Sequence, residues 1–401
     1  MNDADENNDG EYTAQDIQVL GAREAVRRRP GMYISSTDQN GLHSLLYEVV
    51  YNSIDEALAG HSDKVVVTIQ KDNTVTVEDN GRGIPVDIHP TTKISFLETV
   101  MTLMHARLGR KIYPVSGGLQ DFGVFVVNAL SEWCRVDVKR NGKIYYQEYQ
   151  QGIPKGPLEM AGEASDTGTT FSFLADKEIF DEIHFHFNTI ARRMQEIAYL
   201  NKGVKIKLFD AASNRELKLH SGNGISDLVC HLSRNRTLLH PTPIYIFKQI
   251  NSMIIEVAVQ YNDSFNESVF SFANCINTVA GGPHLAGFRS ALTRVLNDYA
   301  YKNKFLKDDD PNLVGDDIRE GLTAIISIKL TEPQFEDQTR TKLSNLEART
   351  AVESTVNEGL SLYLDQNPNY AMNILKKGIS AAMARVTART ERDLNIRKSS
   401  L

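Results

Sequence analysis

Four acidic or amide side chains near residue 50 could transfer a proton and hold a cation. Glu48, Asn52, Asp55 and Glu56 follow one another at i, i+4, i+7 and i+8, which places them on one face if the segment is helical. A carboxylate held against a water molecule can accept its proton, and an amide oxygen suits Mg²⁺ together with waters and phosphate oxygens. The alternative is the solvated polar face of an ordinary amphipathic helix, which is the commoner case for a lone helix.

A glycine-rich turn comes soon afterwards. The stretch EDNGRGIP, from Glu78 to Pro85, directly follows a β-branched run, and Gly81 and Gly83 would let the backbone approach a ligand closely. By itself this motif could be only a turn. A shorter stretch, Thr167-Gly168-Thr169, leads into another expected strand.

A second glycine-rich stretch, VSGGLQDFGV at 115–124, has the outline of a phosphate-binding loop that runs into a helix. Backbone N–H groups at such a turn favour anions. Asp121 opposes this, because a carboxylate about 5 Å from a phosphate charge is repelled by roughly 3 kcal/mol at an effective dielectric of about 20. The alternative is that Asp121 points to water and caps the helix.

These candidates need a helix and a sheet to bring them together. Apolar residues recur at helical spacing from Leu42 to Leu58, and Gly60 is the expected end of that helix. The β-branched runs at 64–69 and 74–79 are joined by a short polar turn, which predicts a hairpin. Further strands are expected near 135–138, 143–150, 169–173 and 204–209. Helices mixed with antiparallel hairpins predict an α+β sandwich and not a doubly wound parallel sheet.

The second half of the chain has its own pattern. The alternation of expected helices and strands is interrupted near 221–224, where a second domain is expected to begin. Strands are expected near 254–261 and 324–329, and the segment at 349–397 is expected to be mostly helical. The predicted organisation is a disordered arm tip at 1–11, a first domain at 12–222 and a second domain at 223–401. Near the end, Arg385, Arg389 and Arg392 fall at i, i+4 and i+7, which predicts a basic stripe. Such a stripe either contacts a DNA backbone or is a solvated helix face.

Composition excludes several classes of protein. The chain of 401 residues has 41% hydrophobic and 24% charged residues, and its apolar runs are too short for a membrane helix. Its acidic beginning is no signal peptide. The three cysteines share no metal-ligand spacing, which is typical of reduced thiols in a cytoplasmic protein. The net charge of −7 means that any contact with DNA needs a local basic patch.

Taken together, the acidic helix, EDNGRGIP, the 115–124 loop and the Thr167–Thr169 stretch resemble, in this order, the GHKL family of ATPases. Within that family the chain is similar to the ATPase subunits of type IIA DNA topoisomerases. The segments AVRRRPGMYI, NSIDEALAG, VNALS, GGPHLAGFR and DDIREGLTAIISIK carry this likeness, which extends from about residue 12 to residue 401. It implies a GHKL (Bergerat) ATPase sandwich followed by a ribosomal-protein-like α/β transducer domain.

The resemblance also implies roles for individual residues. Glu48 matches the general base that activates water, Asn52 matches the Mg²⁺ ligand, and Asp79 matches the acceptor of the adenine amino group. Gln338 and Arg340 match a second-domain loop that reaches the γ-phosphate and takes part in catalysis. The positions that match the family's ATP-binding residues are Tyr12, Asn52, Glu56, Asp79, Arg82, Gly83, Ile84, Pro85, Tyr113, Gly118, Leu119, Gln120, Gly123, Val124 and Thr169.

The implied cofactors are ATP and Mg²⁺, and the implied partners are a second copy of the chain, double-stranded DNA and a separate DNA-cleaving subunit. The second copy would be held through the N-terminal arm that carries Tyr12. Duplex DNA would pass a cavity in the transducer domain. Arg140 matches an arginine at the pocket mouth, where aminocoumarin drugs bind in the family.

Some positions depart from the family pattern. The loop that normally reads GGLHGVG carries Asp121 and Phe122 here, a lysine is replaced by Arg340, and the aspartate before the metal-binding asparagine is replaced by Tyr51. Two hypotheses therefore stay open. The first is an ATP-operated dimer clamp of a type IIA topoisomerase. The second is a catalytically impaired paralogue that acts as a regulatory or partner-binding protein.

Overall fold

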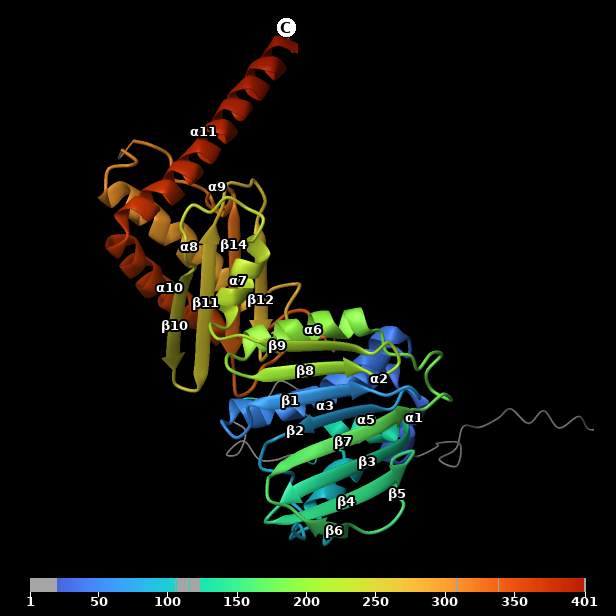
Figure 1. Ribbon diagram of the computed structural model, residues 1–401. Coiled ribbons are helices and arrows are strands. Elements are labelled where there is room, and N and C mark those ends of the chain that lie inside the picture. The colour runs from blue at the N-terminus through green and yellow to red at the C-terminus, as the bar shows by residue number, and fades with distance from the viewer. Residues whose placement is uncertain are drawn as a thin grey trace, which may run out of the picture.

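The structure is a computed structural model that describes residues 20–104, 106, 115, 123–307, 309–337 and 339–399. Within this described part, two sheets lie in two successive regions of the chain, and a long final helix projects from the second region (Figure 1). This mixed arrangement confirms the predicted α+β architecture.

The first sheet holds nine of the described strands, in the order β5-β4-β3-β7-β2-β1-β8-β9, with β6 paired to β4. Its neighbours are antiparallel apart from β1 and β8, which run parallel. The predicted hairpin is the pair β1 and β2, so that prediction is confirmed. The strands are β1 (Lys64–Ile69), β2 (Val75–Asp79), β3 (Ser131–Arg140), β4 (Lys143–Gln150), β5 (Ile153–Pro154), β6 (Glu159–Glu163), β7 (Gly168–Ala175), β8 (Lys205–Asp210) and β9 (Arg215–His220).

Helices cover one face of this sheet. Strands β1, β7 and β8 alternate buried and partly exposed residues, as expected when one face meets a core and the other meets water. Helices α3 and α5 pack on the inner strands and α6 packs on β8 and β9 (Figure 1). The helices are α1 (Ala22–Arg28), α2 (Gly31–Ile34), α3 (Gln39–Leu58), α4 (Phe96–Thr102), α5 (Gly123–Ala129) and α6 (Phe187–Leu200).

The second sheet has the strand order β10-β11-β14-β12-β13. All eight residues of β14 are buried, because α7 covers one face of the sheet while α8 and α10 cover the other. The strands are β10 (Ile244–Ile250), β11 (Met253–Tyr261), β12 (Ser268–Ala273), β13 (Ile276–Asn277) and β14 (Leu322–Lys329). The helices are α7 (Ile225–Ser233), α8 (Pro283–Lys302), α9 (Gly315–Arg319), α10 (Glu347–Gln366) and α11 (Pro368–Ser399).

Helix α7 joins the two regions. Its buried side chains Ile225, Leu228 and Val229 pack in one core with first-sheet residues and with Ala258 and Ile325 of the second sheet. The predicted boundary at residue 222 therefore lies next to a continuous core, and its exact place stays a prediction.

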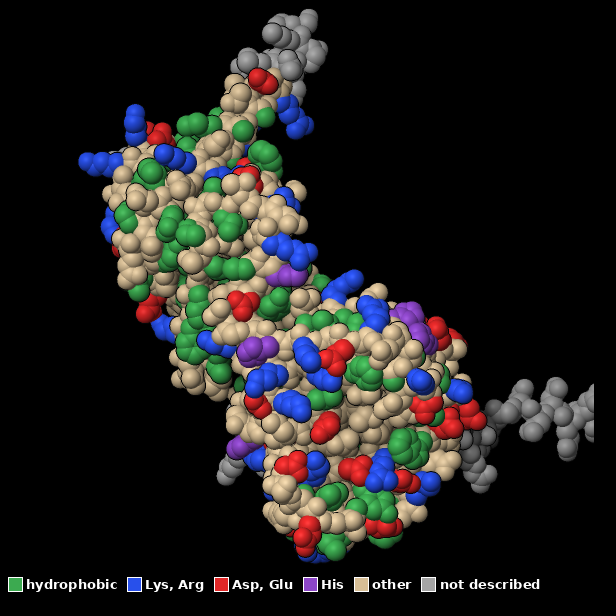
Figure 2. Space-filling model, viewed as in Figure 1, with side chains coloured by type: hydrophobic (Ala, Val, Ile, Leu, Met, Phe, Trp, Pro, Cys, Tyr) green, Lys and Arg blue, Asp and Glu red, His purple; other side chains and the backbone are tan. Residues whose placement is uncertain are grey.

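The basic stripe on α11 needs a correction. Arg385 donates from Nε and Nη2 to the two carboxylate oxygens of Asp317 in α9, both at 2.8 Å. Its charge is therefore balanced within the chain, while Arg389 and Arg392 are exposed. Over the first domain, acidic and basic side chains are interspersed on the face shown in Figure 2. Among the helices in the described part, none is long and apolar enough to cross a membrane.

Candidate active site

Helix α3 carries the acidic group that the spacing singled out. Glu48, Asp55 and Glu56 are only 7%, 6% and 8% exposed, so the interpretation of these acids as a solvated polar face is wrong. Asn52 is exposed, and its Nδ2 donates to the backbone oxygen of Glu48 at 3.0 Å. The amide oxygen of Asn52 is therefore turned away from that carbonyl. Three acids buried on one face of a helix are uncommon, which makes this face a candidate site.

Asp79 lies at the end of β2 and faces α3. Its Oδ2 accepts a hydrogen bond from Ser53 Oγ at 2.9 Å, and its Oδ1 accepts one from the backbone N–H of Gly81 at 2.9 Å. Burial raises the pKa of Asp79, against the opposing effect of these two donors. A carboxylate can accept several hydrogen bonds, so Asp79 is a candidate acceptor for a ligand donor. The importance of Ser53 was not predicted from sequence, because only the fold places it against Asp79.

The turn after β2 packs closely against α3, β3 and β7. A Cβ atom on Gly81 would lie 2.8 Å from Glu56 Oε2, and one on Gly83 would lie 2.7 Å from the backbone oxygen of Lys139. Gly83 also has a positive φ of 73°. Gly83 is therefore required by its backbone conformation and by the close approach of Lys139, whereas a Cβ on Gly81 would meet only side-chain atoms. That the two glycines let a ligand approach the backbone stays a prediction. Between them, Arg82 holds Glu56 through its backbone N–H and through Nε and Nη2, at 2.8, 3.2 and 2.7 Å.

The rest of the turn forms a half-buried edge. Ile84 and Pro85 are partly buried, and the backbone N–H of Ile84 donates to Thr169 Oγ1 at 3.3 Å. Thr169 pairs directly with Asp79 across β7 and β2. Arg140 donates from Nη1 to the backbone oxygens of Gly83 and Arg82, at 2.7 and 3.2 Å.

Several predicted residues lie outside the described part of the chain. These are Tyr12, Tyr113, Gly118, Leu119, Gln120 and Gln338, together with the substituted loop positions Asp121 and Phe122. Gly123 and Val124 begin α5 directly after that loop. Arg340 lies in the segment between β14 and α10, with φ of 57° and its guanidinium 5.8 Å from the Phe335 ring centre.

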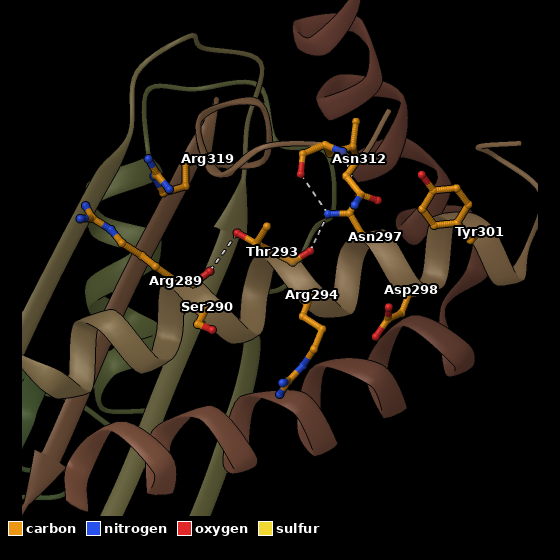
Figure 3. Close-up of a pocket in the computed structure, with 10 residues that line it drawn as sticks. Arg289, Ser290, Thr293, Arg294, Asn297, Asp298, Tyr301, Asn312 and Arg319 are labelled. Carbon is orange, nitrogen blue, oxygen red and sulfur yellow. Dashed lines mark hydrogen bonds between the residues drawn. The ribbon is translucent and has the colours of Figure 1, made fainter. Parts of the chain in front are cut away.

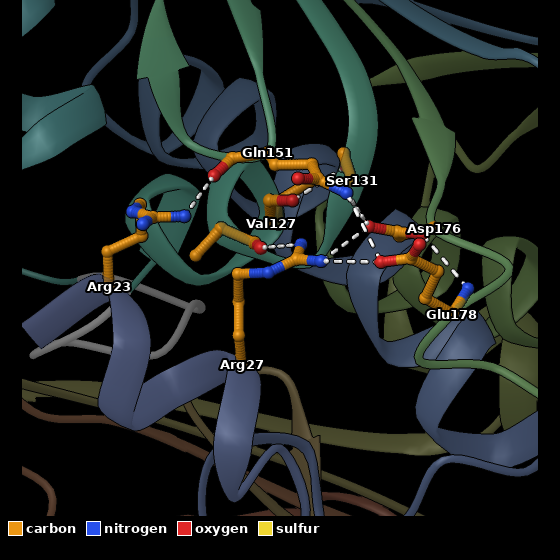
Figure 4. Close-up of polar contacts among 8 residues, drawn as sticks. Arg23, Arg27, Val127, Ser131, Gln151, Asp176 and Glu178 are labelled. Atoms are coloured by element: carbon orange, nitrogen blue, oxygen red, sulfur yellow. Dashed lines mark hydrogen bonds and ion pairs between the residues drawn. The ribbon is translucent and has the colours of Figure 1, made fainter.

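Helix α5 is anchored from behind by a network that sequence reasoning missed (Figure 4). Arg27 of α1 donates to the backbone oxygen of Ala129, the last residue of α5, at 2.9 Å and to Asp176 Oδ2 at 2.7 Å. Gln151 donates to the same carboxylate oxygen at 2.9 Å. Because a cation at a helix C-terminus is favourable, this network stabilises the helix that follows the 115–124 loop.

The described residues fit an adenine nucleotide with a magnesium ion. Asp79 would offer carboxylate oxygens to an amino group, and the glycine turn lies directly after it. Arg140 Nε is buried and has no hydrogen-bond partner among the described residues, so a donor remains available near the turn. Asn52 supplies a single exposed amide oxygen, which is the kind of ligand that Mg²⁺ accepts beside phosphates and waters.

A separate hollow of about 580 Å³ lies along α8 in the second domain (Figure 3). Its three arginines are already paired: Arg289 and Arg319 with Glu267, at 2.7 and 2.9 Å, and Arg294 with Glu353 at 3.1 Å. None of the residues predicted for the nucleotide lines this hollow.

Comparison with known proteins agrees with this geometry. Residues 37–179 match the family model described as "Histidine kinase-, DNA gyrase B-, and HSP90-like ATPase", and residues 224–394 match the model described as "DNA gyrase B". The gyrase B protein of Clostridium acetobutylicum is 49% identical over 97% of this chain, and that of Archaeoglobus fulgidus is 51% identical over 94%. The chain spans 62% and 60% of those two relatives.

Solved structures give the same answer. The 43K ATPase domain of Thermus thermophilus gyrase B, in complex with an aminocoumarin, matches with a TM-score of 0.82 and 38% identity, over 93% of this chain and 98% of that one. The topoisomerase IV ATP-binding domain of Francisella tularensis matches with a TM-score of 0.77 and 30% identity, over 92% and 99%. The chain therefore belongs to the DNA gyrase B family and comprises its GHKL ATPase fold followed by its transducer domain.

Proposed function

We propose that this chain binds and hydrolyses ATP in its first domain, as the nucleotide-operated clamp of a gyrase B-like type IIA topoisomerase. One observation carries the proposal. The buried Asp79, held by Ser53 and Gly81, lies against the helix that presents Glu48 and Asn52. A candidate base-binding carboxylate thus lies against the helix that carries the candidate general base.

Each residue has a distinct task in this proposal. Glu48 accepts a proton from the attacking water, and Asp79 accepts the adenine amino group. Magnesium held by Asn52 would stabilise the negative charge on the phosphate oxygens. Arg82 and Glu56 hold the turn that covers the base, with Ile84 and Pro85 as its apolar wall. Gln338 and Arg340 would contact the γ-phosphate from the transducer domain.

The remaining proposals concern the whole protein. Dimers would form on ATP binding through the arm that carries Tyr12, and duplex DNA would pass the transducer cavity. The exposed Arg389 and Arg392 of α11 would contact the DNA backbone there. A gyrase A-like subunit would supply DNA cleavage, and the complex would act in the cytoplasm. We keep 12–222 and 223–401 as the two domains. The family relationship supports these proposals, whereas the comparisons contain no support for an impaired paralogue.

The test is titration of the chain with a non-hydrolysable ATP analogue and Mg²⁺, with heat and oligomeric mass recorded together. Binding with dimer formation is expected. A folded chain that binds no analogue would contradict the proposal and would favour the impaired paralogue. Repulsion between the carboxylate of Asp121 and the phosphates would then be the first cause to test.

The Glu48→Gln variant separates catalysis from binding. Turnover should fall by a factor of about 100 or more while analogue affinity stays within about threefold, because a general base acts on the chemical step. Glu78→Gln is the matched control, since Glu78 is exposed on β2 next to Asp79. Equal ATP turnover in both variants would show that Glu48 is not the general base.

A further inference from the structure

A polar link joins α3 to the second domain. The buried hydroxyl of Tyr51 accepts a hydrogen bond from the guanidinium of Arg193 in α6. The same Nη2 atom donates to the backbone oxygen of Cys275 at 3.0 Å, and Nη1 donates to Glu196 Oε2 at 2.6 Å. Tyr51 immediately precedes Asn52 on α3. One guanidinium therefore contacts the nucleotide-site helix and the transducer domain together.

The turn that contains Cys275 is held in place by hydrogen bonds to the end of β14. Asn274 and Cys275, between β12 and β13, both have positive φ, 47° and 67°. The buried side chain of Asn274 donates to the backbone oxygen of Leu330 at 2.8 Å and accepts from its N–H at 2.7 Å. The backbone N–H of Asn274 also donates to the oxygen of Ile328 at 2.9 Å. The turn and the end of β14 are thus held as one unit.

Helix α6 contacts the same turn at a second point. Asn201 Nδ2 lies 3.4 Å from Cys275 Sγ and also donates to the backbone oxygen of Ile197 at 2.9 Å. The Cys275 residue is 1% exposed, so the contact is dry. Because packed interiors deform little, a shift of α6 must be followed by the turn or must break these bonds.

The geometry points to Tyr51 as a positioning residue. Acting through Arg193, Tyr51 couples the place of α3, which carries Glu48 and Asn52, to the segment after β14, which carries Arg340. This inference rests on the proposed function, since it concerns how the two halves of that site are held in register. A lysine at 193 could not serve, because a single ammonium lacks the planar fork that reaches all three acceptors.

Two substitutions test the link, and each has a neighbour as its matched control. Tyr51→Phe removes the hydroxyl that accepts from Arg193. Tyr47→Phe deletes a hydroxyl one turn earlier on α3, near the same charges of Arg193 and Glu196 but without the hydrogen bond that Tyr51 makes. Arg193→Lys keeps the charge but not the fork, and Arg192→Lys makes the same change at an exposed position of α6. ATP turnover, analogue affinity and amide hydrogen exchange are measured on these four variants, on the double variant that combines Tyr51→Phe with Arg193→Lys, and on the parent chain.

If Tyr51 positions the two halves, Tyr51→Phe lowers kcat by about tenfold and changes analogue affinity by less than about twofold. Analogue-induced protection of amides persists in 39–58 but is lost in 322–345. Arg193→Lys has the same effect, and the double variant is no worse than either single variant, as expected for residues that act as one unit. Both control variants behave as the parent does.

Three results would overturn the inference: unchanged kcat and protection in Tyr51→Phe, equal losses in Tyr47→Phe, or a fall in analogue affinity as large as the fall in kcat. The last would mean that Tyr51 acts only on the nucleotide pocket. A parent chain that binds no analogue would defeat the proposed function and this inference together, whereas a parent that binds beside an unaffected Tyr51→Phe defeats this inference alone.

Discussion

At the scale of single residues, the site depends on how a buried carboxylate is kept usable. Burial raises the pKa of Asp79, while Ser53 Oγ and the N–H of Gly81 favour its ionised form. The ionised form is the better acceptor for an amino group. The hydroxyl of Ser53 should therefore matter for nucleotide affinity although it need not touch the nucleotide.

The Ser53→Ala variant should bind the ATP analogue about tenfold more weakly, which corresponds to roughly 1.4 kcal/mol for one hydrogen bond to a charged group. Calorimetric titration at pH 7.5 measures this. The control is Ser44→Ala, because Ser44 Oγ donates only to the backbone oxygen of Asn40 within its own helix, at 2.8 Å. Equal affinities for both variants would show that Ser53 does not tune Asp79.

Two glycines allow two reasons for glycine to be distinguished, namely a left-handed backbone conformation and a close approach of another backbone segment. Gly83 and Gly142 have φ of 73° and 75°, but only at Gly83 would a Cβ collide with backbone. Gly142→Ala should lower the free energy of unfolding by about 1 kcal/mol, the cost of the left-handed conformation alone. Gly83→Ala should cost clearly more and should abolish analogue binding. Urea unfolding and titration measure both effects, and equal unfolding energies would contradict the close approach.

At the scale of elements, helices at the back of the sheet support the site. Helix α3 begins at Asp38, whose side chain accepts from the N–H groups of Asn40 and Gly41, and it ends before Gly60 with φ of 80°. Helix α5 is held at its C-terminal end by Arg27 of α1 (Figure 4). The short α5 thus depends on tertiary contacts, since seven residues are too few for a stable isolated helix.

The Arg27→Ala variant should lose about 2–4 kcal/mol of unfolding free energy, because it leaves the carboxylate of Asp176, 3% exposed, without its cation. Arg29→Ala, at an exposed position of the same stretch, should stay within about 0.5 kcal/mol of the parent. Urea denaturation measures both. A loss for Arg29→Ala as large as that for Arg27→Ala would contradict a specific anchor.

The ion pair between Arg27 and Asp176 also predicts how the free energy of unfolding depends on pH. Burial opposes ionisation of Asp176, but the N–H of Glu178 and the guanidinium of Arg27 outweigh it and hold its pKa below 3.8. A lowered folded-state pKa stabilises the protein above pH 3.8, and this contribution is lost as the pH falls through the folded value. The difference between Arg27→Ala and the parent should therefore shrink in strong acid.

At the scale of the whole molecule, each of the two cores holds a neutral histidine. Burial lowers the pKa of His43 to about 4, with His186 and His184 adding to the shift, and burial lowers the pKa of His284 to about 4. His43 Nε2 accepts from the backbone N–H of His186 at 3.1 Å, which requires the neutral ring. His284 Nε2 lies 3.0 Å from Thr278 Oγ1.

These histidines predict acid sensitivity. Their folded pKa values lie below the ordinary 6.5, so the unfolded chain takes up protons first. The free energy of unfolding should be constant above about pH 7 and should fall as the pH drops from 6.5 towards 4. His284→Gln should flatten this dependence, whereas the exposed-site variant His61→Gln should not. A slope that stays the same in His284→Gln would contradict the assignment.

The sequence by itself determined much of this protein. Periodicity predicted α3, the β1–β2 hairpin and the strands at β11 and β14, because alternation and helical spacing are local properties. The glycines of the turn were predicted to let a ligand approach the backbone, which stays a prediction, and the structure shows that they lie against Glu56 and Lys139 of the chain itself. The strands β5, β6, β9, β10, β12 and β13 were not predicted, since their local pattern was weak and pairing decides whether such segments form strands.

Only the tertiary structure decided which polar groups act together. It showed that Glu48, Asp55 and Glu56 are buried, that Ser53 holds Asp79, and that Arg385 is balanced by Asp317. The physical reason is that burial and hydrogen bonding join residues from separate elements, whereas spacing along the chain reports only on one element at a time.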